Sequence, residues 1–278
     1  MSLYEENKLI MRKYNIVPQK KYGQNFLIDD LVLDKIILNA DIQKGDLVIE
    51  IGPGLGNLTK RLCERAGHVV AIEIDKNMVD ILTKEYNKLE NLTILNQDIM
   101  QANLNEIISE FSDLHKVKVV ANLPYYITTP IIIKLIEEKV PVQKIVVMVQ
   151  KEVGNRFKAK PHTKEYSSLT VYLNYYFNIN KIIDVSRNVF IPKPNVDSIV
   201  VEFTQKEKKL PLENEDIFFK LVKDSFTQKR KTLKNNLKGY DLEKVEGVLK
   251  KHNYDLSVRA EALSLEIFAE ISNALAKK

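Results

Sequence analysis

Cysteine, histidine and long apolar runs are all scarce in this chain of 278 residues. The only cysteine, Cys63, excludes an intramolecular disulfide, and its apolar, helical surroundings indicate an inert packed thiol. The 4 histidines are scattered without cysteine partners, so we expect no metal site. No apolar run reaches about 18 residues and the N-terminus lacks the apolar core of a signal peptide, so we expect a soluble, cytoplasmic protein without a membrane partner.

The composition is that of a globular chain with a slight excess of basic residues. Hydrophobic residues make up 45% of the sequence, which is enough for the core of one large domain and one small one. The formal net charge of +5 permits a polyanionic partner but does not require one. Composition alone therefore leaves the function open.

Strand and helix patterns alternate over the larger part of the chain. Apolar runs typical of strands occupy residues 47–51, 68–74, 92–95, 117–121, 144–149, 168–178 and 197–204. Helical patterns separate the early runs, whereas the last two adjoin a helix-poor stretch and suit a terminal antiparallel hairpin. We therefore predict an α/β fold: a doubly wound, seven-stranded Rossmann-like sheet.

A charged segment, Gln205–Asp216, which contains Pro211, marks a boundary after this region. Beyond it every pattern is helical, and the predicted helices cover 217–236, 242–252 and 265–276. We predict two domains: 1–206, of which 1–29 form an N-terminal arm, and a small all-helical domain at 207–278. The arm is either a lid or a disordered segment.

A glycine-rich turn follows the first predicted strand. Residues 47–51 run into Gly52–Gly56 (GPGLG), and 57–64 have the pattern of a helix. Glycines at such a strand-to-helix turn allow positive φ and let a ligand approach the bare backbone. The spacing G-x-G-x-G differs from the dinucleotide fingerprint G-x-G-x-x-G. The turn therefore indicates a nucleotide-type cofactor, with Gly52 close to it.

An acidic residue follows each of the next two strands. Glu73 lies near the end of 68–74, where a carboxylate can accept hydrogen bonds from both hydroxyls of a ribose. Asp98 follows 92–95 and can accept from the exocyclic amine of an adenine, with Ile74 and Ile99 as apolar walls. Each acid alone is typical of a surface, but their positions at successive strand ends indicate one site.

The segment Asn122–Tyr125 (NLPY) closes the apolar run Val117–Ala121. The carboxyl end of a strand is where ligands bind in open α/β sheets. The Asn122 side-chain oxygen and the Leu123 carbonyl can each accept one N–H bond, and Pro124 helps to hold that carbonyl outward. Tyr125 offers a ring for stacking. The segment thus predicts a pocket for an amino group on a flat ring; the alternative is an ordinary turn with a core tyrosine.

Together, these features resemble the S-adenosylmethionine-dependent adenine-N6 methyltransferases that act on RNA. Three further segments resemble motifs of the ribosomal small-subunit adenine dimethyltransferases: Lys20–Leu27 (KKYGQNFL) their N-terminal motif, Phe190–Ser198 (FIPKPNVDS) their F-x-P-x-P-x-V-D-S segment, and Phe226–Leu233 (FTQKRKTL) a basic helix of their C-terminal domain. The resemblance covers nearly the whole chain and shows no departure at a motif position.

This resemblance implies S-adenosylmethionine as cofactor. It places Gly52 at the methionine end, Glu73 at the ribose and Asp98 at the adenine, with Asn122 also in contact. Asn25 and Leu27 of the arm would cap the same site.

The resemblance also implies the reaction: dimethylation of N6 on two adjacent adenines in the 3′-terminal hairpin of small-subunit rRNA. The predicted catalytic residues are Asn122, Leu123, Tyr125 and Phe190, whose ring would close the second face of the flipped base. The implied partners are this rRNA and the immature small subunit late in assembly, and we expect the enzyme to be a monomer.

A basic stretch follows the predicted domain boundary. The interval 223–238 contains six basic residues and one acid, and we assign RNA phosphates as ligands of Lys223, Arg230, Lys231, Lys234 and Lys238. Their spacing predicts one shared helix face, and the alternative is a merely solvated face. A second basic stretch, 151–164, predicts a mobile loop beside the active site.

Other functions remain open at this point. A macrolide-resistance methyltransferase would modify one large-subunit adenine, although the Phe226–Leu233 segment and the chain length favour the small-subunit enzyme. An assembly factor would act by binding more than by chemistry. A DNA amino-methyltransferase is disfavoured because Leu123 stands where those enzymes usually have a second proline.

Overall fold

The computed structural model of the protein describes residues 2–277, and its contacts divide the chain into two compact units. Unit 1 comprises the chain up to Gly154 together with Asn180–Thr204. Unit 2 comprises Asn155–Ile179 and the chain from Gln205 onward. The sequence boundary at residue 206 differs from this division because the segment 155–179 packs with the C-terminal helices.

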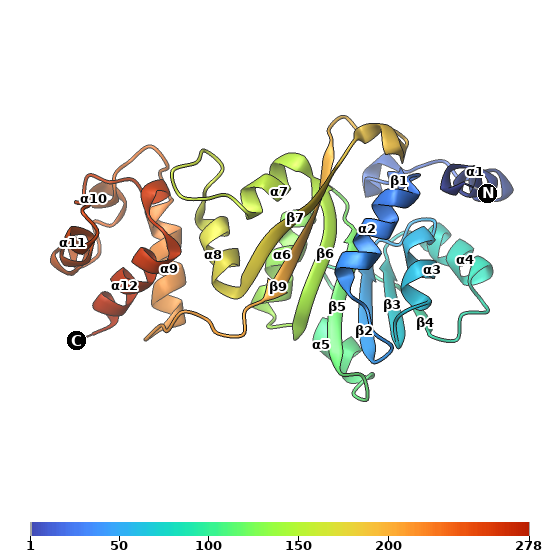
Figure 1. Ribbon diagram of the computed structural model, residues 1–278, viewed down its shortest axis with the longest axis horizontal. Helices are drawn as coiled ribbons and strands as arrows, with labels where there is room; N and C mark the ends of the chain where they lie inside the picture. Colours follow the sequence, from blue (N-terminus) through green and yellow to red (C-terminus); the bar gives the residue numbers. More distant parts are fainter. Residues whose placement is uncertain (1, 278) are drawn as a thin grey trace. The chain divides into compact units, whose positions relative to one another are not determined.

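Unit 1 is built on a seven-stranded sheet with the strand order β4-β3-β2-β5-β6-β9-β7 (Figure 1). The strands are β2 (Asp46–Ile51), β3 (His68–Glu73), β4 (Leu92–Asn96), β5 (Lys116–Asn122), β6 (Val142–Gln150), β7 (Phe177–Val185) and β9 (Ser198–Gln205). Pairing is parallel from β4 to β6, and β9 runs antiparallel to β6. The predicted α/β class is confirmed.

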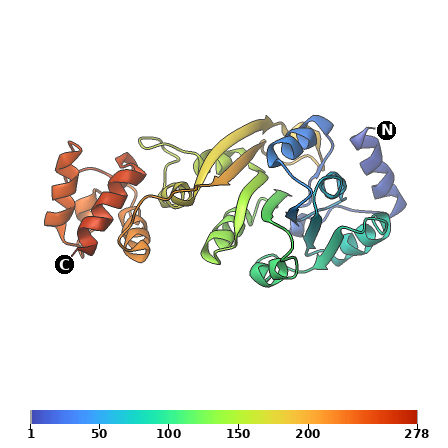
Figure 2. The ribbon, with the colours of Figure 1, turned by 60° about the horizontal axis from the view of Figure 1, so that its bottom comes forward.

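Helices cover both faces of this sheet (Figure 2). They are α2 (Asp30–Ala40), α3 (Asn57–Cys63), α4 (Lys76–Glu85), α5 (Leu104–Ser109), α6 (Thr128–Glu137) and α7 (Lys151–Phe157). Helix α1 (Leu3–Lys13) packs on the rest of the N-terminal arm instead. Because both faces are covered, β2 is buried along its whole length, as expected for a central strand of a parallel sheet. Residues 151–157, expected as a loop, form α7 instead.

The N-terminal arm is ordered. It contains α1, a 3₁₀ turn at Lys20–Tyr22 and the short strand β1 (Phe26–Leu27). β1 pairs antiparallel with β8 (Phe190–Ile191), so two motifs from distant parts of the sequence form one ladder. The arm is therefore an ordered part of unit 1.

The prediction of a strand at 168–178 is wrong, because Ser168–Tyr176 forms helix α8. Its β-branched and aromatic residues favour a strand by propensity, but propensity yields to packing. The Ser167 N–H donates to Thr170 Oγ1 (3.2 Å) at the helix start. Val171 and Tyr175, four residues apart, are buried in the core of unit 2. The seventh strand of the sheet is instead β7, a more polar segment that directly follows α8.

Unit 2 has its own hydrophobic core. Besides α8 it contains α9 (Glu215–Ser225), α10 (Leu233–Asn236), α11 (Leu242–Lys251) and α12 (Leu265–Ala276). The core joins Tyr166, Val171 and Tyr175 to apolar residues of the C-terminal helices such as Phe218 and Phe268. Among residues 2–277, no helix is long and apolar enough to cross a membrane.

The predicted helix 217–236 is also wrong, because it breaks after Ser225 and resumes at Leu233. Residues 226–232 form turns instead. The Asn236 side chain donates to the Ser225 carbonyl (2.7 Å), which satisfies one of the acceptors left at the end of α9. The Leu233 N–H donates to Val258 O (2.8 Å), which directs Leu233 into the core. The basic residues of this stretch therefore do not share one helix face.

Gly56 generates the first prediction. Its φ is +82°, and a Cβ at this position would lie 2.2 Å from the Tyr86 ring. We expect Gly56→Ala to lower the free energy of unfolding by about 2–4 kcal/mol, through backbone strain and overpacking. Denaturant unfolding followed by circular dichroism measures the change.

The matched control is Gly247→Ala in α11, where a Cβ meets nothing within 4 Å. This substitution should raise stability by roughly 0.5–1 kcal/mol, because alanine loses less entropy in a helix. Equal effects of the two substitutions would contradict the assigned conformation of the turn.

Candidate active site

A cleft of about 1050 Å³, counting the open space at its mouth, lies at the carboxyl edge of the parallel strands. Its walls come from the arm, the turn after β2, the ends of β3 and β5 with the residues that follow β3, β4 and β5, and parts of α2 and α3. All six residues predicted to bind the cofactor line it: Asn25, Leu27, Gly52, Glu73, Asp98 and Asn122. The sheet thus brings together side chains that the sequence separates by up to about a hundred residues.

The glycine-rich turn forms one wall of the cleft. Gly52, Gly54 and Gly56 all have positive φ, between +57° and +82°. The Gly52 N–H donates to Ile72 O (2.9 Å), which ties the turn to β3. A Cβ on Gly54 would lie 3.2 Å from the Phe26 ring of the arm. Glycine is therefore needed both for the backbone conformation and for the close approach of the arm.

Glu73 ends β3 with its carboxylate held in place, only 6% of the residue being exposed. Oε1 accepts a hydrogen bond from the Asp75 N–H (2.9 Å). Burial raises the pKa of Glu73, and the backbone amides of Asp75 and Gly54 oppose that shift. The other carboxylate oxygen can accept a hydrogen bond from a ligand in the cleft.

Asp98 lies two residues after β4 and is half-buried. Its Oδ1 accepts from the Met100 N–H (2.9 Å), which fixes the carboxylate at the cleft wall. Ile99 is buried, whereas Ile74 is an exposed large apolar residue. Since both isoleucines line the cleft, this corner combines one acceptor with an apolar slot, the arrangement that an aromatic base requires.

Asn122 is the last residue of β5, and its side-chain orientation is set by the arm. Nδ2 donates to the Asn25 carbonyl (3.1 Å), so the side-chain oxygen is left as an acceptor. The Leu123 N–H donates to Met148 O (3.1 Å), which continues the pairing with β6. No described residue donates to Asn122 Oδ1 or to the Leu123 carbonyl. Two adjacent acceptors are therefore available to one amino group.

Tyr125 lies beside these acceptors and is anchored through its hydroxyl. That hydroxyl is 2.6 Å from Ser198 Oγ, at the start of β9. Burial raises the pKa of Tyr125, so the phenol stays neutral. Ser198 ends the F-x-P-x-P-x-V-D-S segment, and the sequence had not indicated this role for it. The hydrogen bond fixes the ring position that was predicted for stacking.

Phe190 does not lie in the cleft. It is 3% exposed, pairs with Leu27 across the β1–β8 ladder and belongs to the core of unit 1. Its predicted role as the second face of a base pocket is not supported by this position. Tyr126 lines the cleft instead, with 55% of its surface exposed. Its ring lies against Gly23 of the arm, where a Cβ would be 3.4 Å away.

Gln24 is a further wall residue that the sequence did not single out. Its side-chain amide donates to Asp75 Oδ2 (2.8 Å), and Asp75 also supplies the N–H that holds Glu73. Two adjacent residues of the arm are thus hydrogen-bonded to the cleft wall, Gln24 to Asp75 and Asn25 to Asn122. The only indication of this role in the sequence is that Gln24 lies inside the N-terminal motif Lys20–Leu27.

Glu50 is another residue that the sequence did not indicate. It is 1% exposed, lies in β2, whose residues are all buried, and lines the cleft. Burial raises the pKa of Glu50 to about 8. Its Oε2 and Thr59 Oγ1 are buried without a well-aligned hydrogen bond, although the Thr59 hydroxyl lies close enough to oppose the rise of the Glu50 pKa. An incompletely bonded carboxyl at the cleft floor can exchange a hydrogen bond with a ligand there.

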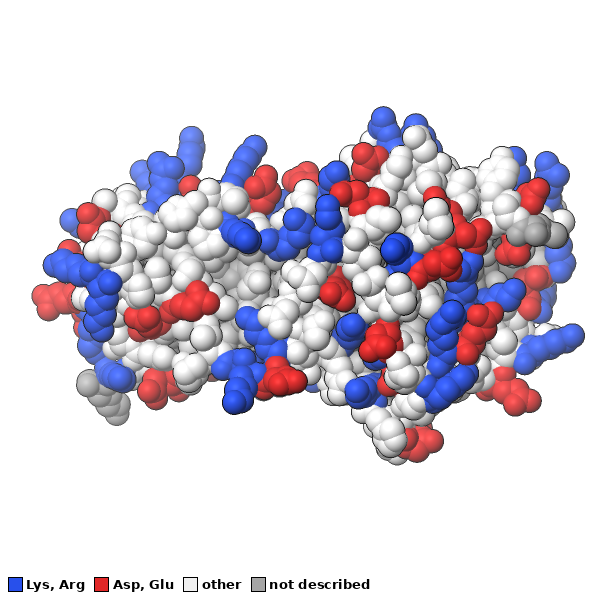
Figure 3. Space-filling view, viewed as in Figure 1, with Lys and Arg blue, Asp and Glu red and all other residues white. Residues whose placement is uncertain are grey.

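A basic surface lies within unit 2. Lys223, Arg230, Lys231, Lys234 and Lys238 are all exposed. The turn at 226–232 contacts the loop before α8 through a bond from Lys229 Nζ to the Lys164 carbonyl, so the two basic stretches adjoin. Lys and Arg side chains project from the edge of unit 2 where these loops lie (Figures 1 and 3). The one acid of the stretch, Asp224, is already bound by Lys220 (2.8 Å).

The cleft fits a nucleoside cofactor with an amino-acid tail. Glu73 and Asp98 supply acceptors, the isoleucines an apolar slot, and the glycine turn bare backbone. The buried Glu50 carboxyl also lines the cleft, in the strand that precedes that turn. Among the described residues, no group of three His, Cys, Asp or Glu side chains could hold a metal ion.

Comparisons with known proteins agree with this geometry. The profile of the family described as ribosomal RNA adenine dimethylase matches residues 17–277. A ribosomal RNA small subunit methyltransferase A from Clostridioides difficile (strain 630) is 45% identical, with 100% of this chain and 98% of the relative covered. A protein of the same name from Bacillus mycoides (strain KBAB4) is 46% identical, with 96% and 94% covered.

Solved structures show the same fold. A dimethyladenosine transferase from Plasmodium falciparum superposes with a TM-score of 0.73 at 29% identity, covering 88% of this chain and 95% of that one. The 23S rRNA methyltransferase ErmE superposes with a TM-score of 0.72 at 24% identity, covering 91% and 100%. The second likeness concerns the fold alone.

Glu50 gives a prediction about pH. Its pKa is raised in the folded state, so the native protein holds a proton that the unfolded chain releases between pH ~4.5 and ~8. Stability from this group is complete below ~4.5 and is lost as the pH rises toward 8. Glu50→Gln should therefore equal the wild type near pH 5 and exceed it by about 2–4 kcal/mol near pH 8.5.

Denaturant unfolding of both proteins without ligand, at several pH values, measures this difference. A constant difference between the two proteins across the range would show that Glu50 does not titrate there.

Proposed function

Because the chain belongs to the ribosomal RNA adenine dimethylase family, we propose that it methylates N6 of two adjacent adenines in the 3′-terminal hairpin of small-subunit rRNA. The protein is an S-adenosylmethionine-dependent rRNA adenine dimethyltransferase. Its relatives at 45% and 46% identity are named small subunit methyltransferases, which supports the choice of subunit. Its partner in this proposal is the immature small ribosomal subunit, on which it acts as a cytoplasmic monomer.

The cleft residues divide between the two ends of the cofactor. Glu73 accepts from the ribose hydroxyls, and Asp98 accepts from the exocyclic amine of the cofactor's adenine between Ile74 and Ile99. Gly52 exposes backbone toward the methionine end, and Asn25 and Leu27 cover the site from the arm. When bound, S-adenosylmethionine supplies an electrophilic methyl group on a sulfonium sulfur.

The target nitrogen requires activation because its lone pair is delocalised into the adenine ring. Asn122 Oδ1 and the Leu123 carbonyl accept hydrogen bonds from the two N6 hydrogens, which favours a pyramidal nitrogen. The bond from Asn122 Nδ2 to the arm holds that oxygen in the accepting orientation. Much of the acceleration then comes from orientation, and one proton leaves the methylated nitrogen for water.

Tyr125 holds the flipped base by stacking, and its bond to Ser198 keeps the ring in place. The basic surface of unit 2 binds rRNA phosphates without reading the sequence. The observation that carries the proposal is the convergence of Asn122, Leu123 and Tyr125 on the cleft that contains Glu73 and Asp98.

Methyl transfer to purified subunits tests the proposal. The protein should label partly assembled small subunits on adenine, and mass spectrometry of the rRNA should place dimethyl groups on two neighbouring adenines. Labelling of large subunits alone would assign the large-subunit activity. Labelling of neither subunit would overturn the proposal.

Asn122→Ala should lower kcat about 100-fold and weaken cofactor binding only slightly, because the hydrogen bond to the target base that it removes is strongest in the transition state. Glu73→Ala is the matched comparison, and it should weaken cofactor binding by about 1–3 kcal/mol through unpaired ribose hydroxyls. Single-turnover kinetics and calorimetry separate the two effects. An Asn122→Ala enzyme that is impaired only in KM would remove Asn122 from the chemistry.

Neutralising Arg230, Lys231 and Lys234 to glutamine should weaken binding to the small subunit. The slope of log K against log salt should fall by roughly 0.7–0.9 for each phosphate that the variant no longer binds. A salt titration of wild type and variant measures both changes, while cofactor affinity should stay constant.

The control is the triple glutamine variant of Lys84, Lys88 and Lys116, which are exposed near the amino edge of the sheet, away from the cleft. This variant should keep the wild-type slope. Equal slopes for all three proteins would show that the basic surface is merely solvated.

A further inference from the structure

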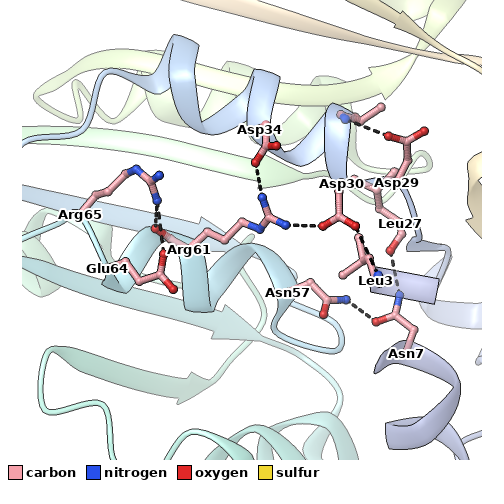
Figure 4. A network of polar contacts seen from close by, with 11 residues as sticks. Leu3, Asn7, Leu27, Asp29, Asp30, Asp34, Asn57, Arg61, Glu64 and Arg65 are labelled. Atoms are coloured by element: carbon pink, nitrogen blue, oxygen red, sulfur yellow. Dashed lines mark hydrogen bonds and ion pairs between the residues drawn. The ribbon is translucent and has the colours of Figure 1, made fainter. Parts of the chain in front are cut away.

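Helix α1 carries a buried polar side chain that the proposed chemistry does not use. Asn7 is 0% exposed, and Figure 4 shows it between the arm and α3. Its Nδ2 donates to the Leu27 carbonyl (2.8 Å). Its Oδ1 accepts from the side-chain amide of Asn57 (2.5 Å). Both partners line the cleft, whereas Asn7 itself lies behind them.

The rest of the inner face of α1 packs against the same walls. Ile10, Met11 and Tyr14 contact an apolar cluster that includes Phe26 and Leu55, and both of these residues also line the cleft. Leu3, four residues before Asn7, is buried in the core with Leu27. One helix face thus supports the arm and the glycine-rich turn together.

Asparagine is a poor choice for this position on helix formation alone. It has a lower helix propensity than alanine or leucine, and burying an amide is unfavourable unless its groups are bonded. Neither property explains an asparagine here, whereas the two hydrogen bonds do. α1 also precedes residue 17, where the match to the family begins.

We propose that Asn7 is a positioning residue for cofactor binding: it sets the spacing between Leu27 of the arm and Asn57 of α3, and so the width of the cofactor cleft. This inference rests on the proposed cofactor site. Removal of the Asn7 amide lets the arm and α3 separate, so the cofactor is held less closely on both sides. The target-base acceptors are not bonded to Asn7, and the arm that orients Asn122 through Asn25 is held closed again when cofactor saturates the cleft.

The test measures binding of S-adenosylhomocysteine by calorimetry in three variants. Asn7→Leu removes both hydrogen bonds and should raise Kd at least about fivefold, the lower edge of typical coupling between sites. Asn7→Asp keeps an acceptor for Asn57 but places a second acceptor against the Leu27 carbonyl, so its Kd should rise as well. The KM for S-adenosylmethionine should rise in parallel, with kcat at saturation unchanged.

Tyr14→Phe is the matched control, because it removes a different bond of α1, from Tyr14 Oη to Glu85 (2.5 Å) at the far end of α4, and keeps the bond from Lys13 Nζ to the same carboxylate (2.7 Å). Its Kd should equal that of the wild type. Amide hydrogen exchange of residues 24–28 should speed up in Asn7→Leu and not in Tyr14→Phe.

An unchanged Kd in a folded Asn7→Leu or Asn7→Asp protein would overturn the inference. An equal rise of Kd in Tyr14→Phe would also overturn it, because docking of α1 as a whole would then be responsible. A wild-type protein that binds no S-adenosylhomocysteine would instead refute the proposed cofactor site.

Discussion

The pairing of parallel strands β2, β3 and β5 is the constraint on which the site depends. Their register brings the glycine-rich turn, Glu73 and Asn122 to one edge of the sheet. The bonds from Gly52 N–H to Ile72 O and from Leu123 N–H to Met148 O extend this pairing beyond the strands. Because backbone hydrogen bonds hold these positions, loops that would otherwise move present their groups at nearly fixed distances.

The same edge concentrates buried carboxyl groups. Glu50 and Glu73 are both buried, and each lies where water is largely excluded. The charge of Glu73 adds to the burial that raises the pKa of Glu50. Burying two neighbouring carboxyl groups is unfavourable, and the burial of the surrounding apolar strands offsets that free energy. The unfavourable contribution lies at the cleft, where a bound ligand can reduce it.

Much of the site could be predicted from the sequence, because each motif is local and lies at a strand end. One rule, that parallel strands end at the same carboxyl edge of a sheet, is enough to predict that four features lie together: the turn at Gly52–Gly56, Glu73, Asp98 and Asn122. Their assembly into one cleft is confirmed by the structure, whereas their roles toward ligands stay predictions. Glu50 was missed because it reads as part of an apolar strand, and its burial is visible only in the fold.

The remaining errors concern segments whose conformation depends on distant partners. The segment 168–176 has strand-like composition, yet it is helical because Val171 and Tyr175 meet the C-terminal helices. The basic residues of 223–238 have helical spacing in the sequence, but the helix is interrupted between them. The hydrogen bond from Leu233 N–H to Val258 O fixes where the next helix begins. Phe190 was assigned to the base pocket from its motif, but pairing with β1 takes it into the core. None of these long-range interactions leaves a local pattern.

The small ladder between β1 and β8 has a consequence for synthesis on the ribosome. Its two strands come from Phe26–Leu27 and Phe190–Ile191, so the first cannot find its partner until most of unit 1 has been translated. Pairings of such long range form late, after local helices and neighbouring strands. The ladder therefore forms only after the residues that line the cleft, all of which precede residue 128, have been synthesised.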